Sequence, residues 1–150
     1  MKNKAYMVLL VDRKKAKLFT LVDGAVDRVE EFTNSHVPQK VKHGDDTWDA
    51  QNKIFRHIED HLHRHLTLIV QQAKLYAAKS HISGIVIGSH GPLFPKIEKH
   101  LPYPLSGKVK GRFVTELKAP FNDILKRAKH LIDQIELKEK AVKERKNHER

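Results

Sequence analysis

The chain of 150 residues contains no cysteine. This absence excludes disulfides, thiolate nucleophiles and zinc–thiolate sites, and it suits a reducing cytoplasm. Long apolar runs are also missing: no stretch approaches the ~20 residues that cross a membrane, and Tyr6–Val11 is too short for the core of a signal peptide. We therefore expect a cytoplasmic protein with no membrane partner.

Glycine is scarce as well, with seven in the chain. The three that follow the central apolar stretch, Gly84, Gly88 and Gly91, match no phosphate-binding loop, in which glycines recur at fixed spacings so that backbone amides can surround a phosphate. The sequence thus gives no support for a nucleotide cofactor, and we expect the protein to use none.

Positive charge is what the chain has in excess, with 29 Lys and Arg against 18 Asp and Glu and a formal net charge of +11. Solubility alone needs a net charge of only ~2–8 in a small domain. The excess favours a polyanionic partner, and no Trp/Phe/Leu face lies opposite the basic residues as in a membrane-surface helix. We therefore expect binding to nucleic acid or ribonucleoprotein, recognised by shape and phosphates without DNA sequence specificity.

The apolar pattern predicts an α/β fold of the order β-β-β-α-β-α-β-α. Asp23-Gly24 is a strong hairpin signal, so the first three strands form an antiparallel meander, and later strands that follow helices run parallel. This order is that of the ribonuclease H-like fold, a mixed sheet with helices on its faces. Strands are predicted at 6–11, 15–22, 25–33, 84–88 and 108–117, and helices at 47–79, 93–100 and from Pro120 onward.

These elements predict one domain over residues 1–136. The long helix carries an apolar stripe at 3.6-residue spacing from Ile54 to Tyr76 or Ala77. The last helix loses its apolar face near residue 137, so we expect residues 137–150 to form a basic, charged tail that frays or is disordered. The oligomeric state does not follow from the sequence.

A ribonuclease H-like order raises the possibility of a metal-dependent nuclease, which needs several converging carboxylates. Asp12 ends the first strand, and Glu59 or Asp60 lies on the long helix, but the fourth strand ends in Gly88-Ser89-His90 without a carboxylate. The cluster is incomplete, so we interpret Asp12 as a turn residue. Ser89 is interpreted as capping a tight turn, because adjacent Ser and His side chains seldom face each other.

Histidines recur on the long helix at His57, His61 and His65, spaced i, i+4 and i+8. Two histidines four residues apart can chelate a divalent metal, but Lys53 and Arg64 nearby oppose a cation. We interpret the stripe as a solvated polar face. If this face has a function, we expect it to contact phosphates. Metal binding there stays open.

The best candidates for anion contact are basic residues in the loop before the long helix, on that helix and near the last strand. Trp48, beside the loop, either anchors the first turn of the helix or stacks on a base. The candidate RNA-binding residues are Lys40, Lys42, His43, Lys53, Arg56, Lys108, Lys110 and Arg112.

Four stretches carry a resemblance to a known family: VLLVDRKKAKLFTLVDG, Lys42-His43-Gly44 before the long helix, GIVIGSHG, and LKAPFNDILKRAKHLID. With them the chain resembles, over roughly Tyr6 to Ile135, the central domain of eukaryotic and archaeal class-one peptide-chain release factors. It is more similar still to stand-alone bacterial and archaeal relatives of that domain. The resemblance implies the ribosome or tRNA as partner.

In that family the loop after Lys-His-Gly carries a Gly-Gly-Gln motif that enters the peptidyl-transferase centre. This chain has Asp45-Asp46-Thr47-Trp48-Asp49 there, and its nearest glutamine is Gln51. We therefore expect an RNA-binding translation factor for rescue, stress or dormancy without release-factor catalysis. The alternatives are a peptidyl-tRNA hydrolase that uses Gln51 or His43, and a protein-interaction module.

Overall fold

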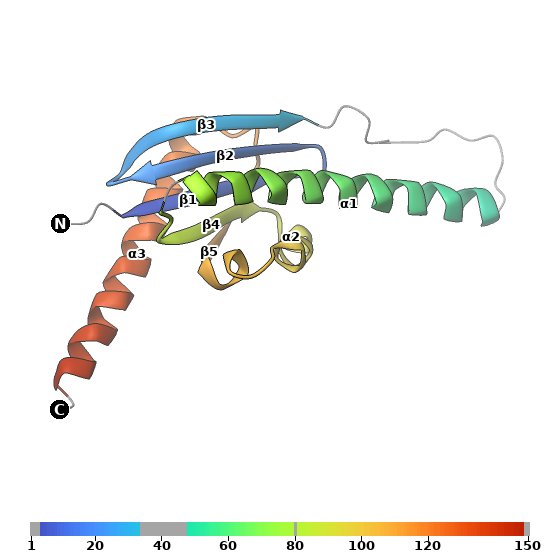
Figure 1. Cartoon of the computed structure of the whole chain (residues 1–150). Helices are drawn as coiled ribbons and strands as arrows, with labels where there is room; N and C mark the ends of the chain where they lie inside the picture. The colour runs from blue at the N-terminus through green and yellow to red at the C-terminus, as the bar shows by residue number, and fades with distance from the viewer. Residues whose placement is uncertain (1–3, 34–47, 80, 149–150) are drawn as a thin grey trace.

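The computed structural model describes the backbone of residues 4–33, 48–79 and 81–148, and the side chains of residues 4–31, 60–79 and 81–144. Within these residues, five strands form one mixed sheet in the order β3-β2-β1-β4-β5, and three α-helices pack against it (Figure 1). The predicted ribonuclease H-like mixed sheet is confirmed.

An antiparallel meander forms one side of the sheet, as predicted. Its strands are β1 (Ala5–Val11), β2 (Lys15–Val22) and β3 (Ala25–Thr33). Asp23 and Gly24 join β2 to β3 with φ values of 52° and 83°. Positive φ at both central residues is what a tight hairpin turn requires, and Asp-Gly meets that requirement at low cost.

Parallel pairing completes the sheet. The strand β4 (Gly84–Ser89) pairs with β1, and β5 (Val109–Val114) pairs with β4. The predicted last strand, 108–117, was therefore too long at its carboxyl end. The Thr115 amide still donates to the Ser89 carbonyl at 3.0 Å, but the chain then turns, with the Ala119 amide bonded to the Glu116 carbonyl at 3.1 Å.

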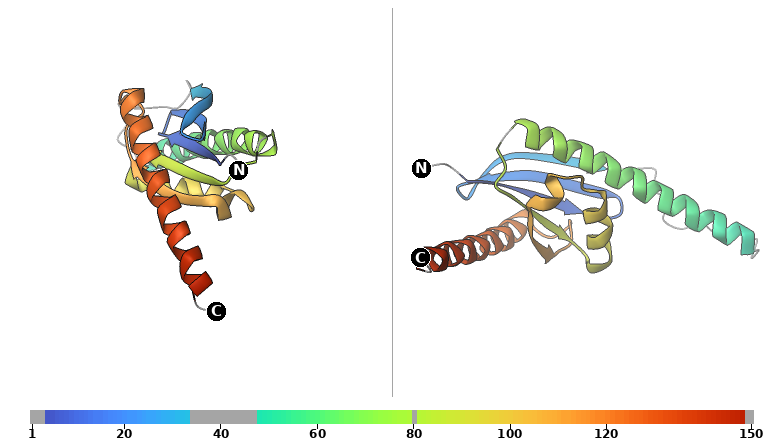
Figure 2. Two further views of the ribbon diagram at one scale, coloured as in Figure 1. Left: turned by 90° about the vertical axis from the view of Figure 1, so that its left-hand side faces the viewer. Right: turned by 60° about the horizontal axis from the view of Figure 1, so that its bottom comes forward.

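Helices cover both faces of the sheet (Figure 2). The helices α1 (Trp48–Lys79) and α2 (Phe94–His100) lie on one face, where they pack on Leu9 and Leu18, and α3 (Phe121–His148) lies on the other against Val8 and Phe19. Two short 3-10 helices, η1 (Gly91–Leu93) and η2 (Leu105–Lys108), flank α2 in the chain. The central strand β1 is buried on both faces.

The apolar stripe predicted on the long helix is confirmed where side chains are described. The buried residues recur every three or four positions and face the sheet: Leu62, Leu66, Ile69, Ala73 and Tyr76. Figure 1 shows the amino-terminal part of α1 extending past the end of the sheet at which β1, β4 and β5 finish. The structure thus presents the start of α1 well away from the core.

The predicted tail is helical through most of its length, one of the two states expected for it, and whether it frays stays a prediction. The helix α3 continues to His148 and projects obliquely from the end of the sheet opposite to the one past which α1 extends (Figure 1). In this part of α3, which lacks an apolar face, opposite charges recur four residues apart, as at Glu136 and Lys140, a spacing that favours a helix.

The packing of β4 against its neighbours generates a prediction at Gly88. A Cβ atom at Gly88 would lie 2.6 Å from Leu10 Cδ2 and 2.8 Å from Phe113 Cζ. We expect Gly88→Ala to lower the free energy of unfolding by about 1–3 kcal/mol, because the packed side chains of Leu10 and Phe113 must shift. Urea unfolding measures the difference. Gly91→Ala is the matched control, because a Cβ there meets no atom within 4 Å; equal stability of the two variants would contradict the packing described.

Candidate nucleic-acid interface

Several residues predicted to contact RNA lie beyond what the structure describes. Lys40, Lys42 and His43 are outside the described residues. Gln51, Lys53 and Arg56 belong to the helical backbone of α1, but their side chains are not described, and the same holds for Trp48. Their roles stay predictions.

The three predicted residues near the last strand all make intramolecular contacts. Lys108 Nζ donates to the Ile82 carbonyl at 3.1 Å. Lys110 Nζ pairs with Glu139 Oε1 at 2.5 Å and joins β5 to α3. These contacts hold the last strand to the rest of the fold, and contact of the same lysines with an anion remains a prediction.

Arg112 connects the last strand to the short helix on the opposite side from α3. Its guanidinium donates to the carboxylate of Glu98 on α2. This hydrogen bond raises the pKa of Arg112 above the ordinary arginine value. Because the pair holds α2 against β5, Arg112 helps to set where the neighbouring residues of α2 lie.

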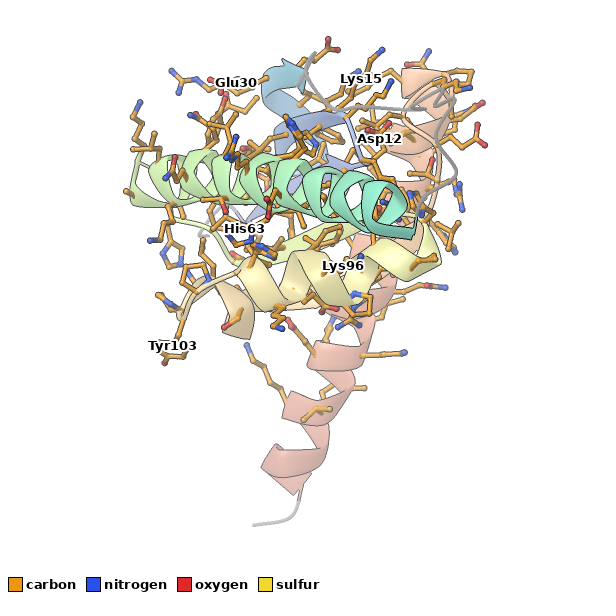
Figure 3. All side chains as sticks on the ribbon, turned by 90° about the vertical axis from the view of Figure 1, so that its right-hand side faces the viewer. Asp12, Lys15, Glu30, His63, Lys96 and Tyr103 are labelled. Atoms are coloured by element: carbon orange, nitrogen blue, oxygen red, sulfur yellow. The ribbon has the colours of Figure 1, made fainter. Side chains whose placement is uncertain are left out.

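A groove of about 430 Å³ lies between α1 and α2. Its floor is apolar, and the polar residues described at its rim are lysines and histidines. Its lining residues are Leu62, His63, Leu66, Lys96, Lys99 and His100. Figure 3 shows His63 and Lys96 on the two adjacent helices. With cations at its rim and no carboxylate among the lining residues whose side chains are described, the groove suits a phosphate group.

The two histidines of the groove contact each other across the helices. His100 Nε2 lies 2.9 Å from His63 Nδ1, and His100 Nδ1 lies 2.7 Å from the carbonyl oxygen of Lys96. The ring centroids are 4.9 Å apart. Sequence reasoning missed this pair because 37 residues separate its members and no local spacing links them.

Burial of His65 corrects the interpretation of the histidine stripe as a solvated face. His65 is 1% exposed, and its Nε2 donates to the carbonyl oxygen of Asp12 at 3.1 Å. Burial lowers the pKa of His65 below the ordinary histidine value. Its role is to hold α1 against the turn after β1. Among the described residues, no group of three or more possible ligands is placed to hold a metal ion.

Two residues at the carboxyl ends of the parallel strands, Asp12 and Ser89, make contacts within the fold. Asp12 Oδ1 accepts from the amides of Lys14 and Lys15 at 2.8 and 2.5 Å, so its interpretation as a turn residue is confirmed. Ser89 was predicted to cap a turn, and this prediction is wrong. Ser89 is the last residue of β4, and its hydroxyl donates to the Val11 carbonyl at 2.5 Å.

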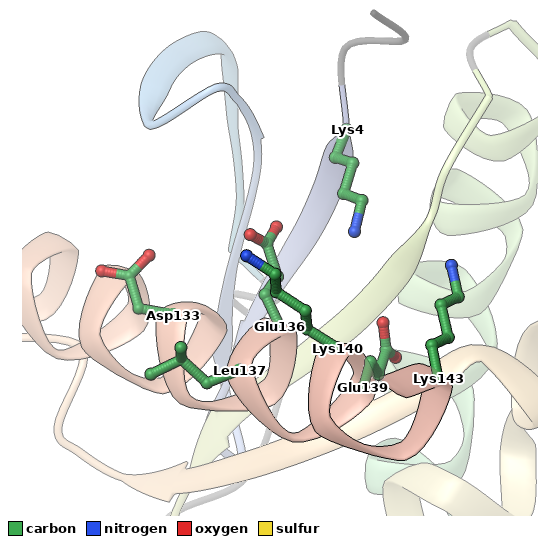
Figure 4. Close-up of a pocket in the computed structure, with 7 residues that line it drawn as sticks. All are labelled: Lys4, Asp133, Glu136, Leu137, Glu139, Lys140 and Lys143. Carbon is green, nitrogen blue, oxygen red and sulfur yellow. The ribbon is translucent and has the colours of Figure 1, made fainter. Parts of the chain in front are cut away.

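Two other cavities carry mixed charge. One of about 640 Å³ lies beyond the carboxyl ends of the strands and includes Asp12 and Glu116 with Lys118 and Arg127. Another, of about 490 Å³, lies between Lys4 and the later turns of α3 (Figure 4). Its charged residues balance, three acidic against three basic: Asp133, Glu136, Glu139, Lys4, Lys140 and Lys143. Neither matches a phosphate as well as the groove between α1 and α2.

Comparison with protein families identifies the chain. A family model described as bacterial archaeo-eukaryotic release factor family 10 matches residues 1–132. The chain belongs to this family. Membership in release factor family 10 supports a translation-related role. A search of curated proteins finds no match.

Solved structures agree on the fold of this family 10 chain. The crystal structure of the archaeal translation termination factor aRF1 matches with a TM-score of 0.56 and 15% identity, over 89% of this chain and 40% of that one. A structure described as an archaeal protein matches with a TM-score of 0.57 and 11% identity, over 97% of this chain and 39% of that one. At such identities the likeness shows the fold alone, and the chain spans about two fifths of each match.

In this family 10 chain, none of the helices that the structure describes is both long and apolar enough to cross a bilayer.

Burial of His65 predicts a pH dependence of stability. The unfolded chain takes up the His65 proton more readily than the folded one, because burial lowers the pKa in the folded state. The free energy of unfolding should therefore fall as pH drops through about 6.5, the ordinary histidine value. In His65→Gln, whose amide still donates but does not titrate, we expect a smaller loss between pH 7.5 and 5.5.

Urea unfolding at several pH values measures this slope. His130→Gln, at an exposed position of α3, is the matched control for changing a histidine to glutamine at the surface. An unchanged slope in His65→Gln would show that His65 is not a source of the acid sensitivity.

Proposed function

We propose that this protein is a ribosome- or tRNA-associated translation factor that binds RNA through its basic surface and acts in rescue, stress or dormancy. The observation that carries the proposal is the basic rim of the groove between α1 and α2, in a chain of net charge +11 that belongs to a release factor family. Family membership supports the setting in translation, and the groove supports the mode of contact.

Helical spacing supports extending the contact surface along α1. Positions 53, 56 and 63 are separated by three and seven residues, so they share one face of the helix. That face leads from the groove toward the amino-terminal end of α1, which extends past the sheet (Figure 1). Lysine and arginine along such a line would follow a phosphate backbone without reading sequence.

The proposal is one of binding without release-factor hydrolysis. The stretch Asp45-Asp46-Thr47-Trp48-Asp49 has no glycine pair, and paired glycines permit backbone angles that other residues adopt at a cost. Three carboxylates would also repel the phosphates around an RNA ester. For the loop as a whole, in which basic Lys40–His43 precede these acidic residues, a contact surface suits better than a catalytic site.

Sedimentation with purified ribosomes and filter binding of tRNA test the proposal. We expect association at low salt that weakens steeply as salt rises, because bound lysines displace counterions from phosphates. Lys99→Glu should lower the affinity about tenfold and reduce the salt slope by about one, since one phosphate contact is lost and a repulsion is added.

The control is Lys126→Glu, which makes the same charge change at an exposed position of α3, on the other face of the sheet. It should leave binding nearly unchanged. Absence of association with ribosomes and tRNA at low salt would overturn the proposal. Equal losses in the two variants would mean that net charge, and not the groove, drives the binding.

A further inference from the structure

The hydrogen-bond chain of the groove determines where its imidazole protons lie. The carbonyl oxygen of Lys96 can only accept, so His100 Nδ1, 2.7 Å away, carries a proton and donates it. In a neutral ring the other nitrogen is then an acceptor. His63 Nδ1, 2.9 Å from His100 Nε2, must therefore donate. In the neutral pair this leaves His63 Nε2 as a hydrogen-bond acceptor.

Among the described side chains that line the groove, His63 Nε2 is placed as an acceptor, whereas the ammonium group of Lys99 only donates. Both nitrogens of His100 are used in the chain of hydrogen bonds. His63 is exposed and lines the groove. The groove thus combines cations that attract phosphate with one neutral nitrogen that needs a proton donor.

We infer that the groove recognises the ribose of RNA, with His63 Nε2 accepting the 2′-hydroxyl proton while Lys99 contacts the adjacent phosphate. The inference rests on the proposed RNA-binding function and names the chemistry of its site. The 2′-hydroxyl is the group that distinguishes RNA from DNA, and lysines alone bind both. His100 is a positioning residue, because it acts by fixing the proton of His63.

Metal binding by the same pair is the weaker interpretation. Two nitrogens 2.9 Å apart could both approach one ion, but the lysines at the rim would repel a divalent cation. The described residues supply no third ligand near the pair. The hydrogen-bonded arrangement needs no ligand beyond those already in place.

Fluorescence anisotropy at pH 8 with three labelled 12-mers of one sequence tests the inference. The probes are RNA, DNA and 2′-fluoro RNA, which keeps an RNA-like sugar but has no hydroxyl proton to donate. We expect RNA to bind about 3- to 10-fold more tightly than 2′-fluoro RNA, the range that one neutral hydrogen bond supplies. The same comparison on a 16-base-pair duplex shows whether the ribose belongs to a single strand or a helix.

Three variants separate the roles. His63→Phe should abolish the preference for RNA over 2′-fluoro RNA, measured as the ratio of the two affinities. Lys99→Ala should weaken binding of all three probes and leave the preference in place. His100→Phe should reduce the preference as His63→Phe does. Nitrogen NMR of the imidazole rings gives an independent readout, with the proton on Nδ1 of His63 in the native protein and no longer confined there in His100→Phe.

The outcomes distinguish this inference from the proposed function. Equal binding of RNA and 2′-fluoro RNA by the native protein would overturn the role of His63 and leave RNA binding intact. A preference that persists in His63→Phe would overturn it as well. Failure of every probe, together with ribosomes and tRNA, to bind would overturn the proposed function itself.

Discussion

Burial of β1 on both faces is the constraint on which the rest of the fold depends. All seven residues of Ala5–Val11 are buried, and the strand lies between β2 and β4. Alternate side chains of a strand point to opposite faces, so a continuous apolar run needs a helix on each side. Met7 and Leu9 pack toward α1, while Val8 and Leu10 pack toward α3. Neither helix could be removed without exposing half of the strand.

Contacts at the end of β1 also help to position the elements around the groove. The carbonyls of Val11 and Asp12 accept from Ser89 on β4 and from His65 on α1. Buried carbonyls require donors, so both contacts fix a neighbouring element against the end of the strand. Arg112 also links α2 to β5, and α1 and α2 lie close enough for His63 to contact His100. The groove is thus shaped by residues that do not line it.

Local sequence patterns predicted the elements that depend on interactions between residues close together in the chain. Alternation and the Asp23-Gly24 turn gave the limits of β2 and β3 correctly, and helical spacing gave the buried stripe of α1. Contacts between distant residues escaped prediction. Nothing near His65 in the chain indicates that its partner is the carbonyl of Asp12, and nothing near Lys110 indicates that Glu139 will pair with it. Candidate site residues chosen by charge alone therefore included side chains that hold the structure together.

Net charge can suggest the class of a partner, but a protein that selects one polyanion from another needs a hydrogen-bond acceptor as well. Ammonium groups attract any polyanion, because they offer donors that rotate freely and demand little geometry. To distinguish ribose from deoxyribose, a site needs a hydrogen-bond acceptor with a fixed direction. A neutral histidine supplies such an acceptor only when its other nitrogen carries the proton and donates it to another group. In this protein the Lys96 carbonyl fixes the position of the proton on His100, and His100 in turn fixes the position of the proton on His63. A choice between ribose and deoxyribose would thus depend on how two helices meet, which no stretch of basic residues reveals.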